Sequence, residues 1–183
     1  MNLPVFITGN QHKADYLNKM LGLPLEHRKA DLDEIQAIDL ELIVEHKVKQ
    51  AYRQLGVPVL VEDVGLKFKA LGGLPGPFVK FFVETSNGLE NMCRMLDSFQ
   101  DRRAIAECVF GYYDGIRLEM FKGSLEGMIA QHPHGSSGFG WDKIFEPIGY
   151  DGRSRAELNE AEDIATYSLI KPLAALREFL KET

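Results

Sequence analysis

The chain has 183 residues and a mass of 20.6 kDa, which suits a single domain, and its 45% hydrophobic and 26% charged residues exclude a disordered or low-complexity protein. The formal net charge of −6 excludes the overall basic field that is typical of proteins that bind nucleic-acid duplexes. No apolar run approaches the ~18 residues of a membrane span, and the first ten residues lack the basic region of a signal peptide. The two cysteines suit reduced thiols. We therefore expect a soluble cytoplasmic protein with no nucleic-acid or membrane partner.

The first third of the sequence alternates short apolar runs with helical spacing. The predicted elements are, in order, a strand over 3–7, a helix over 11–21, a strand over 25–30, a helix over 40–55 and a strand over 57–61. Gly22 and Gly56 are typical helix stops, and Asp39 is suited to cap the second helix.

The remainder begins with a loop rich in glycine and proline and ends in a helix. Its predicted elements are the loop over 71–77, helical spacing from 78 and over 89–99, strands over 104–113 and 116–121, a glycine-rich loop over 135–140 and a helix over 172–180. Asp114-Gly115 predicts a hairpin between the two strands, and Gly123 and Gly127 predict bulges or bends in the returning strand. Strand–helix alternation followed by a hairpin predicts an α/β fold with a mixed sheet and two lobes around a cleft.

The first candidate site is the segment Thr8-Gly9-Asn10-Gln11-His12-Lys13, between a predicted strand and a predicted helix. Glycine allows a ligand to approach the backbone, the helix start offers unpaired N–H groups, and Lys13 adds a charge. The segment predicts a phosphate-binding loop, although its spacing is not that of a Walker loop. The alternative is a helix-capping turn with a solvated lysine.

A second candidate site is the carboxylate pair Glu62 and Asp63, at the end of an apolar strand. Ligands of open α/β sheets bind beyond the carboxyl ends of strands. Adjacent strand residues face opposite sides, so both can serve one site only if the strand ends there, which Gly65 suggests. Carboxylate oxygens suit Mg²⁺, and Glu34 in an acidic loop could join them. The alternative is a solvated acidic strand end.

The third candidate is Gly138-Phe139-Gly140-Trp141-Asp142. An aromatic ring between glycines can lie flat against a nucleobase, and a neighbouring carboxylate can accept from a ring N–H. The alternative is a core aromatic between flexible turns. His132 and His134 have no third ligand at a recognisable spacing and are interpreted as a polar loop. Covalent hydrolysis and zinc chemistry lose support because the motifs G-x-S-x-G, H-E-x-x-H and C-x-x-C do not occur.

Together these segments resemble the inosine triphosphate pyrophosphatase family, whose members hydrolyse deaminated purine triphosphates. The matching stretches are TGNQHK at 8–13, DLDEIQ at 31–36, VLVEDVGLKFKALGGLPGPFVKFF at 59–82 and FGWDKIFEP at 139–147. The resemblance implies an α/β fold with an elongated mixed sheet flanked by helices, in one pyrophosphatase domain over 1–183 whose two lobes surround a central cleft. It also implies a homodimer, and a Mg²⁺-dependent attack of water on the α-phosphorus of a nucleoside triphosphate that releases the monophosphate and pyrophosphate.

The resemblance also implies roles for individual residues. It makes Asp63 the proton acceptor beside Glu62, with Glu34 and Asp63 holding the metal. It places Phe139 against the base and gives the base edge to Asp142. The remaining substrate contacts implied by position are Thr8, Gly9, Asn10, Lys13, Lys47, Val64, Lys80, Gly140 and Trp141.

The chain departs from the family pattern mainly where that pattern recognises the purine's keto group. The pattern has Ser or Thr at Val64, Pro at Lys143, and, before the last helix, a lysine followed by Ser-His-Arg. Here those last positions hold Asp163 and Tyr167-Ser168-Leu169. Because an apolar wall discriminates weakly, we expect a weak preference for ITP and XTP over ATP and GTP, or another best nucleotide. A substitute donor could come from Arg153, Arg155 or Lys171, and Tyr167 could stack or donate.

Three functions of different class are consistent with these features. The first is an active triphosphate pyrophosphatase with altered or relaxed base choice. The second is a nucleotide-binding protein with weakened turnover that acts as a sensor or interaction partner; the retained carboxylates Glu34, Glu62 and Asp63 favour the enzyme. The third, a structural module without a ligand, does not explain why so many lysines and carboxylates stand beside glycine loops.

Overall fold

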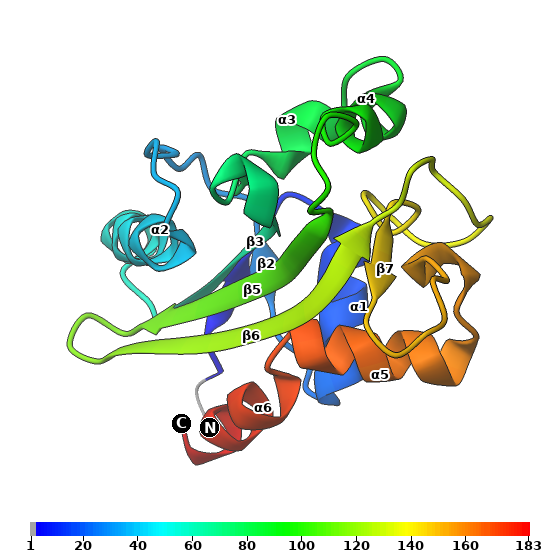
Figure 1. Ribbon diagram of the computed structural model, residues 1–183. Coiled ribbons are helices and arrows are strands. Elements are labelled where there is room, and N and C mark those ends of the chain that lie inside the picture. The colour runs from blue at the N-terminus through cyan, green and yellow to red at the C-terminus, as the bar shows by residue number, and fades with distance from the viewer. Residues whose placement is uncertain (1–2) are drawn as a thin grey trace. The chain divides into compact units, whose positions relative to one another are not determined.

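The computed structural model describes residues 3–183 and has a mixed α/β fold (Figure 1). The strands are β1 (Val5–Ile7), β2 (His27–Arg28), β3 (Val59–Phe68), β4 (Pro75–Gly76), β5 (Arg103–Tyr113), β6 (Leu118–Ile129) and β7 (Phe145–Pro147). The helices are α1 (Gln11–Leu21), α2 (Leu40–Leu55), α3 (Val79–Val83), α4 (Gly88–Arg94), α5 (Glu160–Ile170) and α6 (Leu173–Glu182), with short 3-10 helices at η1 (Lys69–Leu71) and η2 (Arg155–Glu157).

The seven strands form one mixed sheet. Their order is β2-β1-β3-β5-β6-β7, and β4 pairs with β3. Strand β1 runs parallel to both β2 and β3, with Val5 opposite Val59, whereas β4 and β7 are antiparallel to β3 and β6. The predicted fold, a mixed sheet flanked by helices, is confirmed.

The chain forms two compact units. The N-terminal unit comprises the chain up to Asp63 together with Cys108–Lys122 and Pro172–Thr183, and the central unit comprises Val64–Glu107 and Gly123–Lys171. Three long strands, β3, β5 and β6, contribute residues to both units. The cleft expected from the sequence stays a prediction.

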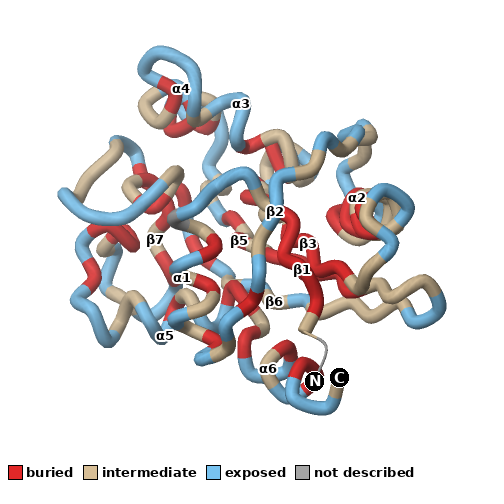
Figure 2. The backbone as a smooth tube through the Cα atoms, turned by 180° about the vertical axis from the view of Figure 1, so that it is seen from behind, coloured by how far each residue is buried: buried red, intermediate tan, exposed pale blue. Residues whose placement is uncertain are grey.

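Helix α2 builds the core of the N-terminal unit, as its apolar stripe predicts. Leu40, Val44, Val48 and Ala51 recur every three or four positions and pack against buried valines of β1, β3 and β5. The helix begins where the Asp39 carboxylate accepts from the N–H of Glu41, and it ends at Gly56 in a left-handed conformation. Figure 2 shows these strands and the inner face of α2 as buried.

Strand β3 does not end at Asp63, so that expectation is wrong. The strand continues to Phe68, and Leu66 pairs with Gly76 of β4. A Cβ atom on Gly65 would lie 3.2 Å from the backbone of Gly76. Gly65 therefore lets β4 approach closely and does not interrupt β3.

Strand β6 includes Gly123 and Gly127, which the sequence places in the returning strand, and it ends at Ile129. A Cβ on Gly123 would lie 2.5 Å from the carbonyl oxygen of Ile170. Helix α5 was not predicted because it buries little apolar surface. It begins in a capping box in which Asn159 accepts from the N–H of Glu162 and the Glu162 carboxylate accepts from the N–H of Asn159.

The structure bears on two expectations from the composition, that the cysteines are reduced thiols and that the chain has no membrane span. Cys93 and Cys108 are both buried and are not joined in a disulfide, and burial raises the pKa of Cys93 to about 12, which keeps that thiol protonated. Within residues 3–183, every helix is too short or too polar to cross a membrane.

Candidate active site

The loop from Thr8 to Lys13 is ordered by its own side chains. Asn10 caps α1, since its Oδ1 accepts from the N–H of Lys13 at 3.2 Å, and Thr8 Oγ1 accepts from the N–H of Asn10 at 3.1 Å. The first turn of α1 carries no acidic residue, which leaves the positive end of the helix available to an anion. The backbone packing around Gly9 does not require a glycine, because a Cβ there would only touch the Lys29 side chain at 3.5 Å.

Lys13 is paired with Glu62. The ammonium lies 3.1 Å from Glu62 Oε2, and the carboxylate side chain is only 1% exposed. The Cys108 thiol lies 3.5 Å from Glu62 Oε1. Glu62 therefore fixes the position of a lysine beside the α1 loop.

Lys47 brings together the two residues expected to hold the metal. Its Nζ donates to Glu34 Oε1 at 2.8 Å and to Asp63 Oδ2 at 2.7 Å. Burial opposes the charge on Lys47, but Asp63 and Glu34 outweigh it, and the pKa of Lys47 lies above its ordinary value. An acidic loop, a helix and a strand thus converge on a permanent ammonium flanked by two carboxylates.

The adjacent carboxylates of β3 serve different sides of the strand. Because successive strand residues point to opposite faces, Glu62 meets Lys13 of α1 while Asp63 meets Lys47 of α2. The continued strand therefore separates the two carboxylates that the sequence placed in one site.

Glu34 and Asp63 suit a hard cation. They reach the same point in space, and Mg²⁺ takes few protein ligands beside water and phosphate oxygens. Among the described side chains, no group of three or more His, Cys, Asp or Glu residues could hold a metal ion, so the donor set offers two carboxylates instead of a closed cage.

In the central unit, glycines shape the loop before β7. Gly138 has a φ of 84°, and a Cβ there would lie 2.6 Å from that of Asp142. The N–H of Phe139 donates to Asp142 Oδ2 at 2.8 Å. Phe139 is 83% exposed. Trp141 instead packs edge-on against Phe145, with ring centroids 5.5 Å apart. The loop thus leaves Phe139 exposed and is anchored by the packing of Trp141 on Phe145.

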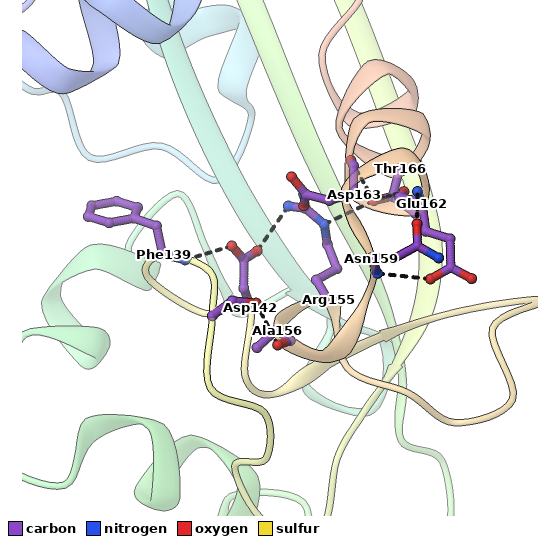
Figure 3. Close-up of polar contacts among 9 residues, drawn as sticks. Phe139, Asp142, Arg155, Ala156, Asn159, Glu162, Asp163 and Thr166 are labelled. Carbon is purple, nitrogen blue, oxygen red and sulfur yellow. Dashed lines mark hydrogen bonds and ion pairs between the residues drawn. The ribbon is translucent and has the colours of Figure 1, made fainter.

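Asp142 belongs to a buried ionic network that the sequence did not predict as a unit (Figure 3). Arg155 Nη1 donates to Asp142 Oδ1 at 2.9 Å, and Nη2 donates to Asp163 Oδ1 at 2.5 Å. Arg155 Nε donates to Thr166 Oγ1 at 3.2 Å. The guanidinium is therefore held by the loop on one side and by α5 on the other.

Backbone contacts place η2, which carries Arg155, against the glycine loop. The N–H of Ala156 donates to the carbonyl of Asp142 at 3.3 Å, and Ser137 Oγ donates to the carbonyl of Ala156 at 2.6 Å. The surroundings of Asp142 change its pKa. Burial raises the pKa of Asp142, and although Arg155 opposes the rise, the pKa remains above the ordinary value.

The remaining predicted residues have the following surroundings. Lys80 has a 75% exposed side chain on α3, 3.9 Å from Glu84. Val64 follows Asp63 within β3. The His132–His134 loop is polar as interpreted, with His134 between Glu146 and Glu157.

Comparisons with known proteins match this chain over nearly its whole length. A model of the Ham1 family matches residues 4–179. The chain is 39% identical over 179 residues to an inosine triphosphate pyrophosphatase of Emericella nidulans, covering 96% of this chain and 94% of that protein. It is 40% identical over 183 residues to one of Yarrowia lipolytica, covering 97% and 95%. The solved structure of a HAM1 protein from Coxiella burnetii matches with a TM-score of 0.85 and 26% identity, covering 99% of this chain and all of that one.

Proposed function

Since the chain belongs to the Ham1 family, we propose that it is a nucleoside triphosphate pyrophosphatase that acts on deaminated purine nucleotides. Its relatives of 39–40% identity bear that activity in their names, and they are matched over nearly their whole length. Water attacks the α-phosphorus, the bond from that phosphorus to the bridging oxygen breaks, and the products are a nucleoside monophosphate, pyrophosphate and a proton.

One observation carries the proposal: Glu34, Lys47 and Asp63 meet at a single point. Phosphoryl transfer depends on positioning and charge neutralisation more than on covalent help, and this cluster offers a cation and two carboxylates. Lys47 keeps its proton and binds phosphate oxygens. Asp63 accepts the proton of the attacking water.

The other groups of the N-terminal unit bind the triphosphate in this proposal. The start of α1 supplies N–H donors, and Lys13, positioned by Glu62, supplies a second ammonium. Glu34 and Asp63 hold Mg²⁺, which when bound neutralises phosphate charge.

The central unit selects the base. The exposed ring of Phe139 stacks on it, and Asp142 accepts from a ring N–H. The second interpretation of the sequence, a binder with weakened turnover, is not favoured, because the relatives are named as pyrophosphatases.

The test is a product assay over a panel of nucleoside triphosphates, with Mg²⁺ and with EDTA. We expect pyrophosphate and monophosphate from ITP and XTP with Mg²⁺, and no release with EDTA. Orthophosphate as the first product would indicate attack on the γ-phosphorus and would refute the reaction class. Undiminished release with EDTA would refute the metal.

A further inference from the structure

We propose that Arg155 selects the base in this chain, by donating a hydrogen bond to the 6-keto oxygen of a purine while Asp142 beside it accepts from N1–H. This inference rests on the proposed function and adds a residue to it. It assigns a donor to a region where the family pattern has lysine and arginine and this chain has Asp163 and Leu169.

The Arg155–Asp142 pair is complementary to one kind of base edge. Nη1 of Arg155 and Oδ1 of Asp142 are 2.9 Å apart, so a donor and an acceptor stand side by side. A 6-oxopurine presents a keto acceptor next to an N1–H donor, which matches this order. A 6-aminopurine presents an amino donor next to an N1 acceptor and would meet donor with donor.

Arg155 retains donors for a ligand. Its guanidinium has five N–H groups, and the bonds to Asp142, Asp163 and Thr166 use three of them. The side chain is only 6% exposed, so water competes weakly for the remainder. A hydrogen bond made in so shielded a place discriminates strongly between an acceptor and a donor on the base.

The network also explains why Asp163 is compatible with a keto-reading site. A carboxylate that faced a keto oxygen would repel it, and Asp163 stands where the family pattern has a lysine. In the structure Asp163 points to Arg155 and holds its Nη2 at 2.5 Å. The positive charge that the family pattern has on α5 is here supplied by Arg155 of η2, and Asp163 of α5 orients that guanidinium.

The two other substitute donors considered from the sequence have different surroundings. Arg153 forks onto the Glu162 carboxylate with both terminal nitrogens, at 2.9 and 2.6 Å. The ammonium of Lys171 lies 4.9 Å above the ring of Tyr167. The direct bond to the base-reading carboxylate singles out Arg155.

The test compares kcat/KM for ITP, GTP and ATP in the wild type and in Arg155→Gln. Loss of a charged donor should lower the values for ITP and GTP together, because both bases carry the 6-keto and N1–H edge, by roughly 10- to 100-fold. The value for ATP should change far less, so the ITP-to-ATP ratio falls. Arg153→Gln is the matched control, and it should leave the ratio unchanged.

Equal loss for all three nucleotides, or no loss, would overturn the inference, because an arginine that donates to the 6-keto oxygen must distinguish 6-oxopurines from a 6-aminopurine. If Arg155→Gln does not fold, Arg155→Lys keeps a cation but cannot make all three bonds, and an unchanged ratio in that variant would be equally decisive. Affinities for IMP and AMP, measured by calorimetry, give the same ratio without turnover. If the wild type releases pyrophosphate from no nucleotide, the proposed function fails, while the IMP-to-AMP ratio still tests Arg155.

Discussion

The two units carry clusters of opposite design. In the N-terminal unit, one lysine is shared by two carboxylates, Glu34 and Asp63, and the site faces a ligand with charge. In the central unit, one arginine is shared by two carboxylates, Asp142 and Asp163, and an exposed ring stands beside them. A phosphate needs only charge and reach, whereas a base edge needs donors and acceptors in a fixed order. The second cluster is accordingly the more buried, since the Arg155 side chain is 6% exposed and the Lys47 side chain 14%.

The largest expected effect is on the stability of the central network. Arg155→Gln removes the partner of the buried Asp142 carboxylate, and losing one member of a buried ion pair costs about 3–5 kcal/mol of unfolding free energy. Arg153→Gln, two residues away, should change stability little because its pair with Glu162 lies at the surface. Urea denaturation of both variants measures the difference. Equal midpoints would mean that the Asp142–Arg155 bond does not hold the network together.

The next effect sharpens the role of the N-terminal cluster. Asp63→Asn keeps the size of the side chain but removes its basicity, and loss of a general base lowers kcat by about 10²-fold or more. Asp33→Asn is a suitable control, because Asp33 is an exposed carboxylate of the same acidic loop that bonds to Gln50. Near-normal turnover in Asp63→Asn would remove Asp63 from the chemistry.

The smallest effect is a pH dependence of base binding. Burial places the pKa of Asp142 above that of an ordinary Asp, while Arg155, Lys171 and the N–H of Phe139 lower it and Asp163 raises it. As the pH falls through this raised pKa, the carboxylate becomes an acid and accepts poorly from N1–H, so affinity for IMP should decline. Arg155→Gln removes a group that lowers the pKa, and the decline should then begin at a higher pH.

Calorimetric titration with IMP between about pH 4 and 7 measures both curves. Coincident curves for wild type and Arg155→Gln would show that Arg155 does not affect the pKa of Asp142.

Local signals made much of the fold predictable. Helix α2 has its cap, its apolar stripe and its glycine stop within one stretch of sequence. The meaning of Gly65 depends on β4, ten residues further on, so the glycine looked like a strand end. Helix α5 has almost no apolar stripe, and the signal that could have predicted it is the Asn159–Glu162 spacing of a capping box.

The site, like the fold, is predictable where the signal is local and not where it depends on contacts between separate segments. Resemblance to a family located Glu34, Lys47 and Asp63, and the structure joins them. The bond from Arg155 to Asp142 joins two irregular segments thirteen residues apart, where no periodicity fixes which side chains meet. Sequence could name Arg155 as one of several substitutes, and the fold of η2 against the glycine loop was needed to choose it.

The most direct test of this division of labour uses a ligand that has phosphates and no base. Inorganic tripolyphosphate should inhibit the wild type in competition with ITP. Lys13→Gln keeps a donor for Glu62 but removes the charge, and it should raise the inhibition constant about 10-fold or more. Phe139→Ala should raise KM for ITP, because stacking on a base contributes about 1–3 kcal/mol, and should leave the tripolyphosphate constant unchanged. Equal weakening of tripolyphosphate by both variants would contradict the assignment of phosphates to one unit and the base to the other.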